Sequence, residues 1–439
     1  MRAKLTVTVT VVAVAVLATV VAAVGAPASA CPRAVRGLGM VAAVARGRVE
    51  VMDLATCRTR VVARMSVTSP VGRANSPVVH FLGDGRWLVY ATTAANGLLR
   101  GPFVVPVTGG PVRMPLGSGL VAFTWAPDGS RLYGITGGGE LVSAAPTGGR
   151  RVVAAGLGTS AATTARSLAI SPDGRDAAVD ISRCGEIAAT ELLTVDLRTG
   201  RLRTALRQTG EYATLTGWSP DGRWLLYWPQ SICSASLAAD GFPLYAVAAG
   251  GEGHPVRAVA QTLLYPDFLA WCAGRLIAAS TPDRETELDG KLVQSGPPAW
   301  RQRTIDNARP LSWVSPSCSA SGRWLVATAG ANRQIPFGAE HRSVYLLRSD
   351  GALVRRLSQP GAADLSDEAP RFSRDGRWVL FVRSRVVTAG ASADSHDTIE
   401  LVRASGAGTA VPVLSFTSGD FSYYDHFDWP TEIDWYQPG

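Results

Sequence analysis

A short hairpin motif recurs along the chain and constrains its fold more than any other feature. An apolar or aromatic pair precedes a turn containing Asp-Gly or a substitute, followed by Arg and an apolar run. The clearest copy is Trp218-Ser-Pro-Asp-Gly-Arg-Trp-Leu-Leu-Tyr227. Proline presets φ, the Asp side chain bonds neighbouring amides, and glycine takes the positive φ that a short hairpin loop needs. Each copy therefore predicts two antiparallel strands joined by a tight turn.

The copies are spaced like the blades of a propeller. Their turn glycines are Gly85, Gly129, Gly174, Gly222, Gly274, Gly322 and Gly376, at intervals of 44, 45, 48, 52, 48 and 54 residues. Four short strands per unit at this period are typical of a β-propeller blade. We therefore predict structural roles for the following turn residues: Asp84, Gly85, Asp128, Gly129, Asp173, Gly174, Asp221, Gly222, Asp375 and Gly376.

The number of units predicts an all-β propeller of eight blades, with seven as the alternative. At the mean interval of 48.5 residues, eight units account for 388 of the 409 residues that follow residue 30. Three more strands are expected at 40–44, 48–54 and 59–63, without an innermost partner. The segment 426–436 could supply that partner. Both ends of the chain would then share one blade and leave no open edge.

The repeat resembles the TolB-type, WD-repeat-like propeller repeats, whose hallmark is a Trp-Ser-Pro-Asp-Gly hairpin. Residues 217–227 match it best, and Ser366-Asp-Glu-Ala-Pro-Arg-Phe-Ser-Arg-Asp-Gly376 also matches in the residues before the turn. The resemblance covers nearly all of the chain after residue 30 and implies four-stranded blades. It indicates little about function, because such repeats occur both in binding proteins and beside hydrolase domains.

The first 30 residues are typical of a secretory signal peptide. Arg2 and Lys4 precede an uncharged stretch at 5–24, and Ala28-Ser29-Ala30 provides a small-residue cleavage site. The stretch is also long enough for an uncleaved anchor, which would be the one route to membrane association. We expect 1–30 to be a leader and 31–439 a single propeller domain, exported to the cell envelope or the extracellular space.

Six cysteines follow the leader: Cys31, Cys57, Cys184, Cys233, Cys272 and Cys318. An even number in an oxidising compartment favours three disulfides over a lipid anchor on Cys31, which would leave an odd thiol. Cys184 and Cys233 lie 10 and 11 residues after their turn glycines, whereas Cys272 and Cys318 lie 2 and 4 residues before theirs. Such near-equivalent positions on adjacent blades suit disulfide geometry. The predicted disulfides are Cys31–Cys57, Cys184–Cys233 and Cys272–Cys318.

The sequence contains no recognisable catalytic motif. It has no Gly-x-Ser-x-Gly elbow, no P-loop, no His-Glu-x-x-His and no Cys-x-x-Cys, and its five histidines lie far apart. We therefore predict no catalytic residue, no metal site and no cofactor. A site assembled from scattered His and Asp by the propeller loops stays open as the alternative.

The chain is basic, with a formal net charge of +8, and 41 of its 43 basic residues are arginine. Codon bias accounts for the preference for arginine. A modest positive charge favours anionic envelope polymers or lipid headgroups as partners. Because the sequence has no Lys/Arg run and no nucleic-acid-binding motif, no nucleic-acid partner is predicted.

Long loops form the predicted binding surface. Residues 281–298, 330–341 and 385–396 follow the second strand of a blade, and 66–75 and 359–368 connect blades. In the propellers that this chain resembles, these loop classes share one face around the channel mouth. Such faces commonly bind partners, with tolerated insertion as the alternative. The candidate binding residues are Asp367, Glu368, Arg333, Phe337, His341 and His396.

We expect a monomeric, non-catalytic scaffold outside the cytoplasmic membrane that holds an envelope protein, a peptide or an anionic cell-wall polymer on one face. The alternative is an enzyme with a lyase, lactonase or glycan-cleaving site at the channel mouth, with Ca²⁺ as a possible requirement. Three or more acids or histidines converging there would favour the enzyme. A mouth lined by apolar and Arg side chains would favour binding.

Overall fold

The computed structural model describes residues 32–438, apart from 46, 66–77, 94–98, 159–163, 184–188, 231–239, 252, 283–287, 307–309, 335–340, 388–394, 419–421, 424–425 and 428. The chain divides into two compact units, Met1–Ala30 and Cys31–Gly439, and the described residues all belong to the second. The predicted signal peptide lies outside them and remains a prediction. Among the described residues, no helix has the length and apolar character needed to cross a membrane.

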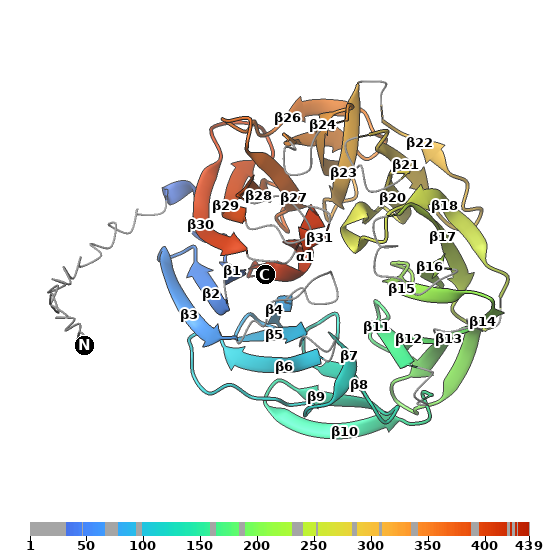
Figure 1. Cartoon of the computed structure of the whole chain (residues 1–439). Helices are drawn as coiled ribbons and strands as arrows, with labels where there is room; N and C mark the ends of the chain where they lie inside the picture. Colours follow the sequence, from blue (N-terminus) through green and yellow to red (C-terminus); the bar gives the residue numbers. More distant parts are fainter. Residues whose placement is uncertain are drawn as a thin grey trace, which may run out of the picture. The chain divides into compact units, whose positions relative to one another are not determined.

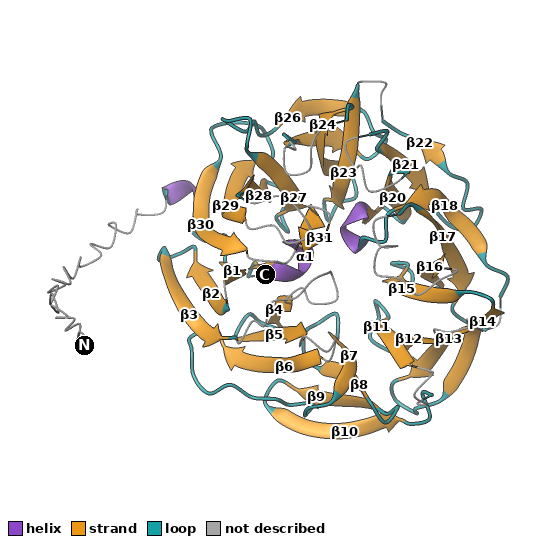
Figure 2. Cartoon of the chain, viewed as in Figure 1, coloured by secondary structure: helices purple, strands orange, loops and turns teal. Residues whose placement is uncertain are grey.

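Eight β-sheets of the described chain are arranged as the blades of a ring (Figure 1), and a ninth sheet consists of the two short strands β31 and β32. Helix contributes only short segments (Figure 2). Blades 1 to 4 contain the following strands: β1 (Met40–Ala45), β2 (Arg48–Asp53), β3 (Arg58–Arg64) and β33 (Ile433–Tyr436); β4 (Val78–Leu82), β5 (Trp87–Thr93) and β6 (Leu99–Pro106); β7 (Leu120–Trp125), β8 (Leu132–Thr136), β9 (Leu141–Ala145) and β10 (Gly148–Ala154); β11 (Thr164–Ile170), β12 (Asp176–Arg183), β13 (Ala189–Asp196) and β14 (Leu202–Thr209).

Blades 5 to 8 follow the same order: β15 (Tyr212–Trp218), β16 (Trp224–Gln230), β17 (Phe242–Ala248) and β18 (Val256–Thr262); β19 (Leu269–Cys272), β20 (Arg275–Ser280), β21 (Lys291–Ser295) and β22 (Arg303–Thr304); β23 (Leu311–Cys318), β24 (Trp324–Ala331), β25 (Ser343–Arg348) and β26 (Leu353–Arg356); β27 (Ser366–Phe372), β28 (Trp378–Val386), β29 (Ser395–Arg403) and β30 (Val411–Ser418). The short elements are η1 (Arg33–Val35), η4 (Pro266–Phe268), β31 (Ser422–Tyr423), β32 (His426–Phe427) and α1 (Trp429–Glu432).

The strands of each blade are antiparallel, and in blades 2 to 8 the chain runs from the innermost strand outward (Figure 1). Blade 2 has three strands, with an isolated bridge between Val104 and Arg113 at its outer edge. The predicted fold, an eight-bladed propeller of four-stranded blades, is confirmed, and the seven-bladed alternative is wrong.

The ring closes where the two ends of the described chain meet. Strand β33 lies beside β1, pairing Tyr436 with Met40 and Ile433 with Ala43, and so becomes the innermost strand of blade 1. The closing strand predicted over 426–436 is shorter than expected, because residues 429–432 form α1. Pro430 has no N–H to give to a strand ladder but is tolerated in the first turn of a helix.

The Asp-Gly turns have the expected chemistry. The seven turn glycines have φ between 65° and 76°. In blade 4 the Ser171 hydroxyl donates to Asp173 at 2.7 Å, and the Ser171 oxygen accepts the Asp176 N–H at 2.9 Å. The hydrogen bond from Ser171 lowers the pKa of the Asp173 carboxyl. The turn is thus held by local side-chain bonds.

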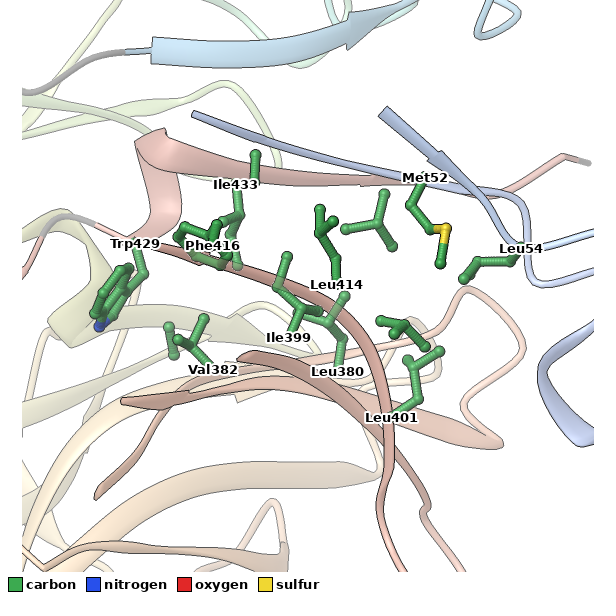
Figure 3. Packing of buried hydrophobic residues seen from close by; sticks show 14 of the residues in the cluster. Met52, Leu54, Leu380, Val382, Ile399, Leu401, Leu414, Phe416, Trp429 and Ile433 are labelled. Atoms are coloured by element: carbon green, nitrogen blue, oxygen red, sulfur yellow. The ribbon is translucent and has the colours of Figure 1, made fainter. Parts of the chain in front are cut away.

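The hydrophobic core lies between neighbouring blades. Figure 3 shows the cluster between blades 8 and 1, where Leu380 and Leu401 of one sheet face Met52 and Leu54 of the next. The tryptophans that follow Gly-Arg in the motif belong to such clusters: Trp87, Trp224, Trp324 and Trp378. Each blade buries both of its faces against the two neighbouring blades. Close packing of this kind makes the ring rigid.

One predicted disulfide is present among the described residues. Cys272 on β19 and Cys318 on β23 are joined, with their Cα atoms 5.5 Å apart, and link the innermost strands of blades 6 and 7. Cys57 is also disulfide-bonded. Cys31, Cys184 and Cys233 lie outside the described residues, so the pairs Cys31–Cys57 and Cys184–Cys233 remain predictions.

The antiparallel order gives the ring two different ends. We call the end with the Asp-Gly turns the turn face. The connections between second and third strands and those between blades lie at the opposite end, the loop face. Of the predicted binding surface, residues 66–75, 283–287, 335–340 and 388–394 fall outside the described residues.

Candidate functional site

A cavity of about 430 Å³ lies on the inner side of blades 3 to 6. Its walls come from the last residues of β7, β11 and β15 and from β19, together with Pro127 and Pro172 of two Asp-Gly turns. Because innermost strands run toward these turns, the cavity is near the turn face. We call it the axial cavity.

Three indole rings dominate the axial cavity. Trp125, Trp218 and Trp271 all line it, and each stands at or next to the end of an innermost strand, directly before a motif turn. Trp218 Nε1 donates to the carbonyl of Ala169 in the adjacent blade at 3.1 Å. Trp271 meets Trp300 edge-on, with ring centroids 6.2 Å apart. These contacts hold two of the rings in place while leaving part of each surface accessible.

The remaining described walls are apolar or weakly polar. Pro127, Pro172 and Pro266 contribute rings, and the other lining residues are Leu, Ile, Ala, Gly and two threonines. None of the described lining residues is Asp, Glu, His, Lys, Arg or Cys. The cavity therefore offers stacking and apolar surface, with few groups that could satisfy a strongly polar ligand.

A polar cluster adjoins the axial cavity through Trp125. The His80 ring stacks on Trp125, with centroids 4.1 Å apart and planes 14° from parallel. His80 Nδ1 lies 2.8 Å from Asp434 Oδ2, and the backbone N–H of Phe81 donates to the same oxygen at 2.8 Å. Burial raises the pKa of Asp434, but the bonds from His80 and Phe81 and the charge of Arg371 bring it below its ordinary value.

Asp367 and Glu368, predicted to bind at the channel mouth, are buried in ion pairs. Arg383 forms a two-point contact with Asp367 at 2.7 and 3.0 Å and also contacts Glu400 at 3.0 Å. Arg342 contacts Glu368 at 2.8 Å. Buried carboxylates matched in this way are typical of structural networks, here linking blades 7 and 8. That they bind a ligand remains a prediction.

Three other predicted binding residues, His341, His396 and Arg333, lie on the loop face. His341 is exposed, with Nδ1 3.0 Å from the carbonyl of Leu365, and so lies close to the start of β27. His396 is exposed, with Nδ1 3.4 Å from Thr417 Oγ1. Arg333 is exposed just after β24, and Phe337 lies outside the described residues. Among the described residues, no group of three His, Cys, Asp or Glu side chains is arranged to hold a metal ion.

Sequence reasoning missed the axial cavity. The signal was present in the first position of the motif, where tryptophan occurs at Trp125, Trp218 and Trp271. In the sequence, an aromatic residue at this position indicates only the repeat. Equivalent strand ends on successive blades lie side by side around the ring, so a large residue repeated there indicates a lined cavity.

Comparisons with known proteins find similar solved structures at low sequence identity. Similar solved structures include oligogalacturonate lyase from Vibrio parahaemolyticus (10% identity, 78% of this chain and 93% of that chain, TM-score 0.47) and a protein described as TolB from Agrobacterium tumefaciens (17%, 74% and 91%, TM-score 0.32). Another is prolyl oligopeptidase B from Galerina marginata (10%, 81% and 53%, TM-score 0.47). No protein-family model and no curated protein matches the chain. Likenesses this distant carry no argument about activity, so the function of this eight-bladed β-propeller has to be argued from its own residues.

Proposed function

We propose that this chain is an exported binding protein that holds a peptide segment of an envelope protein in the axial cavity and catalyses no reaction on it. The observation that carries the proposal is the lining of that cavity: three tryptophans, three prolines and no titratable side chain among the described residues. Its volume of about 430 Å³ is within the usual range of ligand pockets.

The lining favours a peptide over a glycan. Sugar hydroxyls that leave water need hydrogen-bonding partners, and the side chains described here supply only two hydroxyls, from Thr124 and Thr216. Tryptophan and proline surfaces instead suit proline rings and aromatic or aliphatic side chains. An apolar side chain, or a short proline-containing turn of a larger protein, fits these walls.

The enzymatic alternative lacks support in the cavity. A general acid or base must lie within hydrogen-bond reach of the reacting group. His80 stacks on Trp125 but is not among the described residues that line the cavity. Export is supported by the leader-like sequence of residues 1–30 and by the Cys272–Cys318 disulfide, which suits an oxidising compartment.

The test is a binding screen with the purified full chain. The probes are synthetic twelve-residue peptides in three classes (rich in proline and aromatics, acidic, basic) and a set of cell-wall oligosaccharides. We expect the first class to bind and to change tryptophan fluorescence. Trp125→Ala or Trp271→Ala should weaken the best peptide about 30-fold, which corresponds to about 2 kcal/mol for the loss of a central aromatic anchor.

Two controls accompany the screen. Trp125→Phe keeps an aromatic ring and should retain most of the affinity, and Val354→Ala truncates an exposed apolar residue on β26 and should have no effect. The proposal is wrong if the best peptide binds all variants equally. It is also wrong if only oligosaccharides bind and the alanine variants abolish that binding.

A further inference from the structure

The outermost strands of the ring carry charge of one sign. Every outermost strand from blade 1 to blade 7 (β3, β6, β10, β14, β18, β22 and β26) contains at least one arginine, and none of the eight outermost strands contains Asp or Glu. The whole chain has 43 basic and 35 acidic residues. Its composition therefore does not explain why the outer strands are exclusively basic. We call these outer-strand arginines the arginine rim.

Protection against aggregation explains only part of this pattern. An outermost strand presents unpaired N–H and C=O groups, and charged side chains there discourage pairing with another molecule. Positive charges, negative charges or a mixture of both would prevent such pairing equally well. A rim of one sign instead favours anions along the outer strands of blades 1 to 7.

Much of this charge is uncompensated. Two rim arginines are paired with acids: Arg207 of β14 contacts Glu191 at 2.7 Å, and Arg150 of β10 contacts Glu140 at 3.6 Å. Among the described residues, no carboxylate forms an ion pair with the arginines of β3 (Arg58, Arg60 and Arg64) or with Arg257 of β18. The arginines of β3 lie on an edge with no acid of its own. Such guanidinium groups are available to an external anion.

A formed cleft lies within the arginine rim. A cavity of about 320 Å³ between β18 and β22 is lined by Arg257 and Arg303, with Trp300, Gln302, Ala260 and Thr304. Gln302 Oε1 accepts the N–H of Ala260 at 2.6 Å and so ties blade 6 to the edge of blade 5.

The groups in this cleft are held in place. Arg303 donates through Nε and Nη2 to Gln294 Oε1 at 2.9 and 2.5 Å, which fixes its guanidinium plane. Trp300 is 3% exposed and packs against Trp224 and Trp271. Its indole nitrogen is buried without a hydrogen-bond partner in the described structure. Two guanidinium groups, an amide and a hydroxyl thus converge on one small volume, a set of donors suited to an oxyanion.

We propose that the arginine rim binds a linear polyanion with repeated phosphate groups, and that the cleft between β18 and β22 is its anchoring site. Repetition of arginine from blade to blade matches a repeating ligand better than a single small anion. The aromatic ring in the cleft is buried, so no platform for stacking nucleic-acid bases is offered there. A polymer without bases is therefore favoured. This proposal does not depend on the axial cavity.

The experiment measures binding of long-chain inorganic polyphosphate to the full chain between 50 and 300 mM salt. The double variant Arg257→Gln/Arg303→Gln is compared with the double variant Arg175→Gln/Arg223→Gln. The latter replaces two exposed arginines of the turn face and changes the net charge by the same amount. We expect wild-type affinity to fall as salt rises. The cleft variant should bind at least about 10-fold more weakly, since two charged contacts with the anion are lost. The turn-face control should stay within about twofold of wild type.

Three further arms decide between ligands. Polyglutamate and orthophosphate should bind much more weakly than polyphosphate, and oligo-dT should bind no better than polyphosphate. Equal loss in the cleft and control variants, absence of polyphosphate binding at 50 mM salt, or tighter binding of polyglutamate or oligo-dT would each overturn the proposal. Trp125→Ala should leave polyphosphate affinity unchanged, which separates this proposal from the one for the axial cavity.

Discussion

Asp434 is the residue at which three blades meet. It lies on β33 in blade 1, contacts His80 and the backbone of Phe81 in blade 2, and faces Arg371 of blade 8 at 4.0 Å. These partners lower the pKa of Asp434 although burial opposes them, so the folded state favours the carboxylate. A carboxyl whose folded pKa is lowered stabilises the protein above its unfolded pKa, and this stabilisation disappears as pH falls through the folded pKa.

Asp434→Asn should therefore lower the free energy of unfolding at pH 7 by about 1–3 kcal/mol, the cost of weakening bonds to a buried charged acceptor. Denaturant titrations at pH 7 and pH 3 measure the difference between wild type and variant. We expect this difference to shrink at pH 3. Asp364→Asn, which removes an exposed contact with Arg385, should cost less than about 1 kcal/mol. A difference for Asp434→Asn that is the same at both pH values would contradict this assignment.

Two turn glycines with the same conformation differ in their surroundings. Gly129 and Gly174 have φ of 65° and 71°. A Cβ on Gly129 would lie 2.0 Å from the backbone nitrogen of Gly83 in blade 2, whereas a Cβ on Gly174 would meet nothing within 4 Å. Gly174→Ala should cost about 1–2 kcal/mol for positive φ alone. Gly129→Ala should cost clearly more, because two backbones must separate. Thermal unfolding of both variants checks this order, and equal melting temperatures would argue against turn-to-turn contact.

Strand β33, the last strand in the sequence, completes blade 1 as its innermost strand. Its Ile433 is 1% exposed and packs in the cluster between blades 8 and 1. Ile433→Ala should lower the free energy of unfolding by about 2–5 kcal/mol. Because β33 covers the inner edge of β1, amide exchange along Met40–Ala43 should also accelerate. Leu202→Ala, at a 36% exposed position on β14, serves as the control and should change neither property. Exchange at β1 that stays unchanged in Ile433→Ala would show that ring closure does not depend on this contact.

At the scale of the whole molecule, the fold follows from local chemistry repeated along the chain. Each Asp-Gly turn needs only the residues next to it, so the hairpins and their spacing are readable from the sequence. The meeting of β1 with β33 is also predictable, since three strands without an inner partner require one. Strand β33 starts later than predicted, at Ile433, because residues 429–432 form α1, in which Pro430 is tolerated.

The sites are less predictable, because they depend on contacts between residues distant in sequence. The sequence shows Asp367 and Glu368 as two acids before a predicted strand. In the structure they lie in β27 and form ion pairs with Arg383 of β28 and with Arg342, which directly precedes β25. His80 becomes notable only when Trp125 stacks on it and Asp434, 354 positions away, lies beside it. These contacts depend on the direction of each side chain and on the curvature of the ring. Neither can be predicted from the spacing of motifs in the sequence.

The shared first blade has a consequence for how the protein is made. Strand β1 ends at residue 45 and its inner partner begins at residue 433, 388 positions later. During vectorial synthesis or translocation, the three earliest strands emerge long before the segment that covers them, with one edge open to stray pairing. Contacts of such long range also make the last folding step slow. Until residues 433–436 have emerged, the inner edge of β1 lacks the strand that pairs with it in the folded ring.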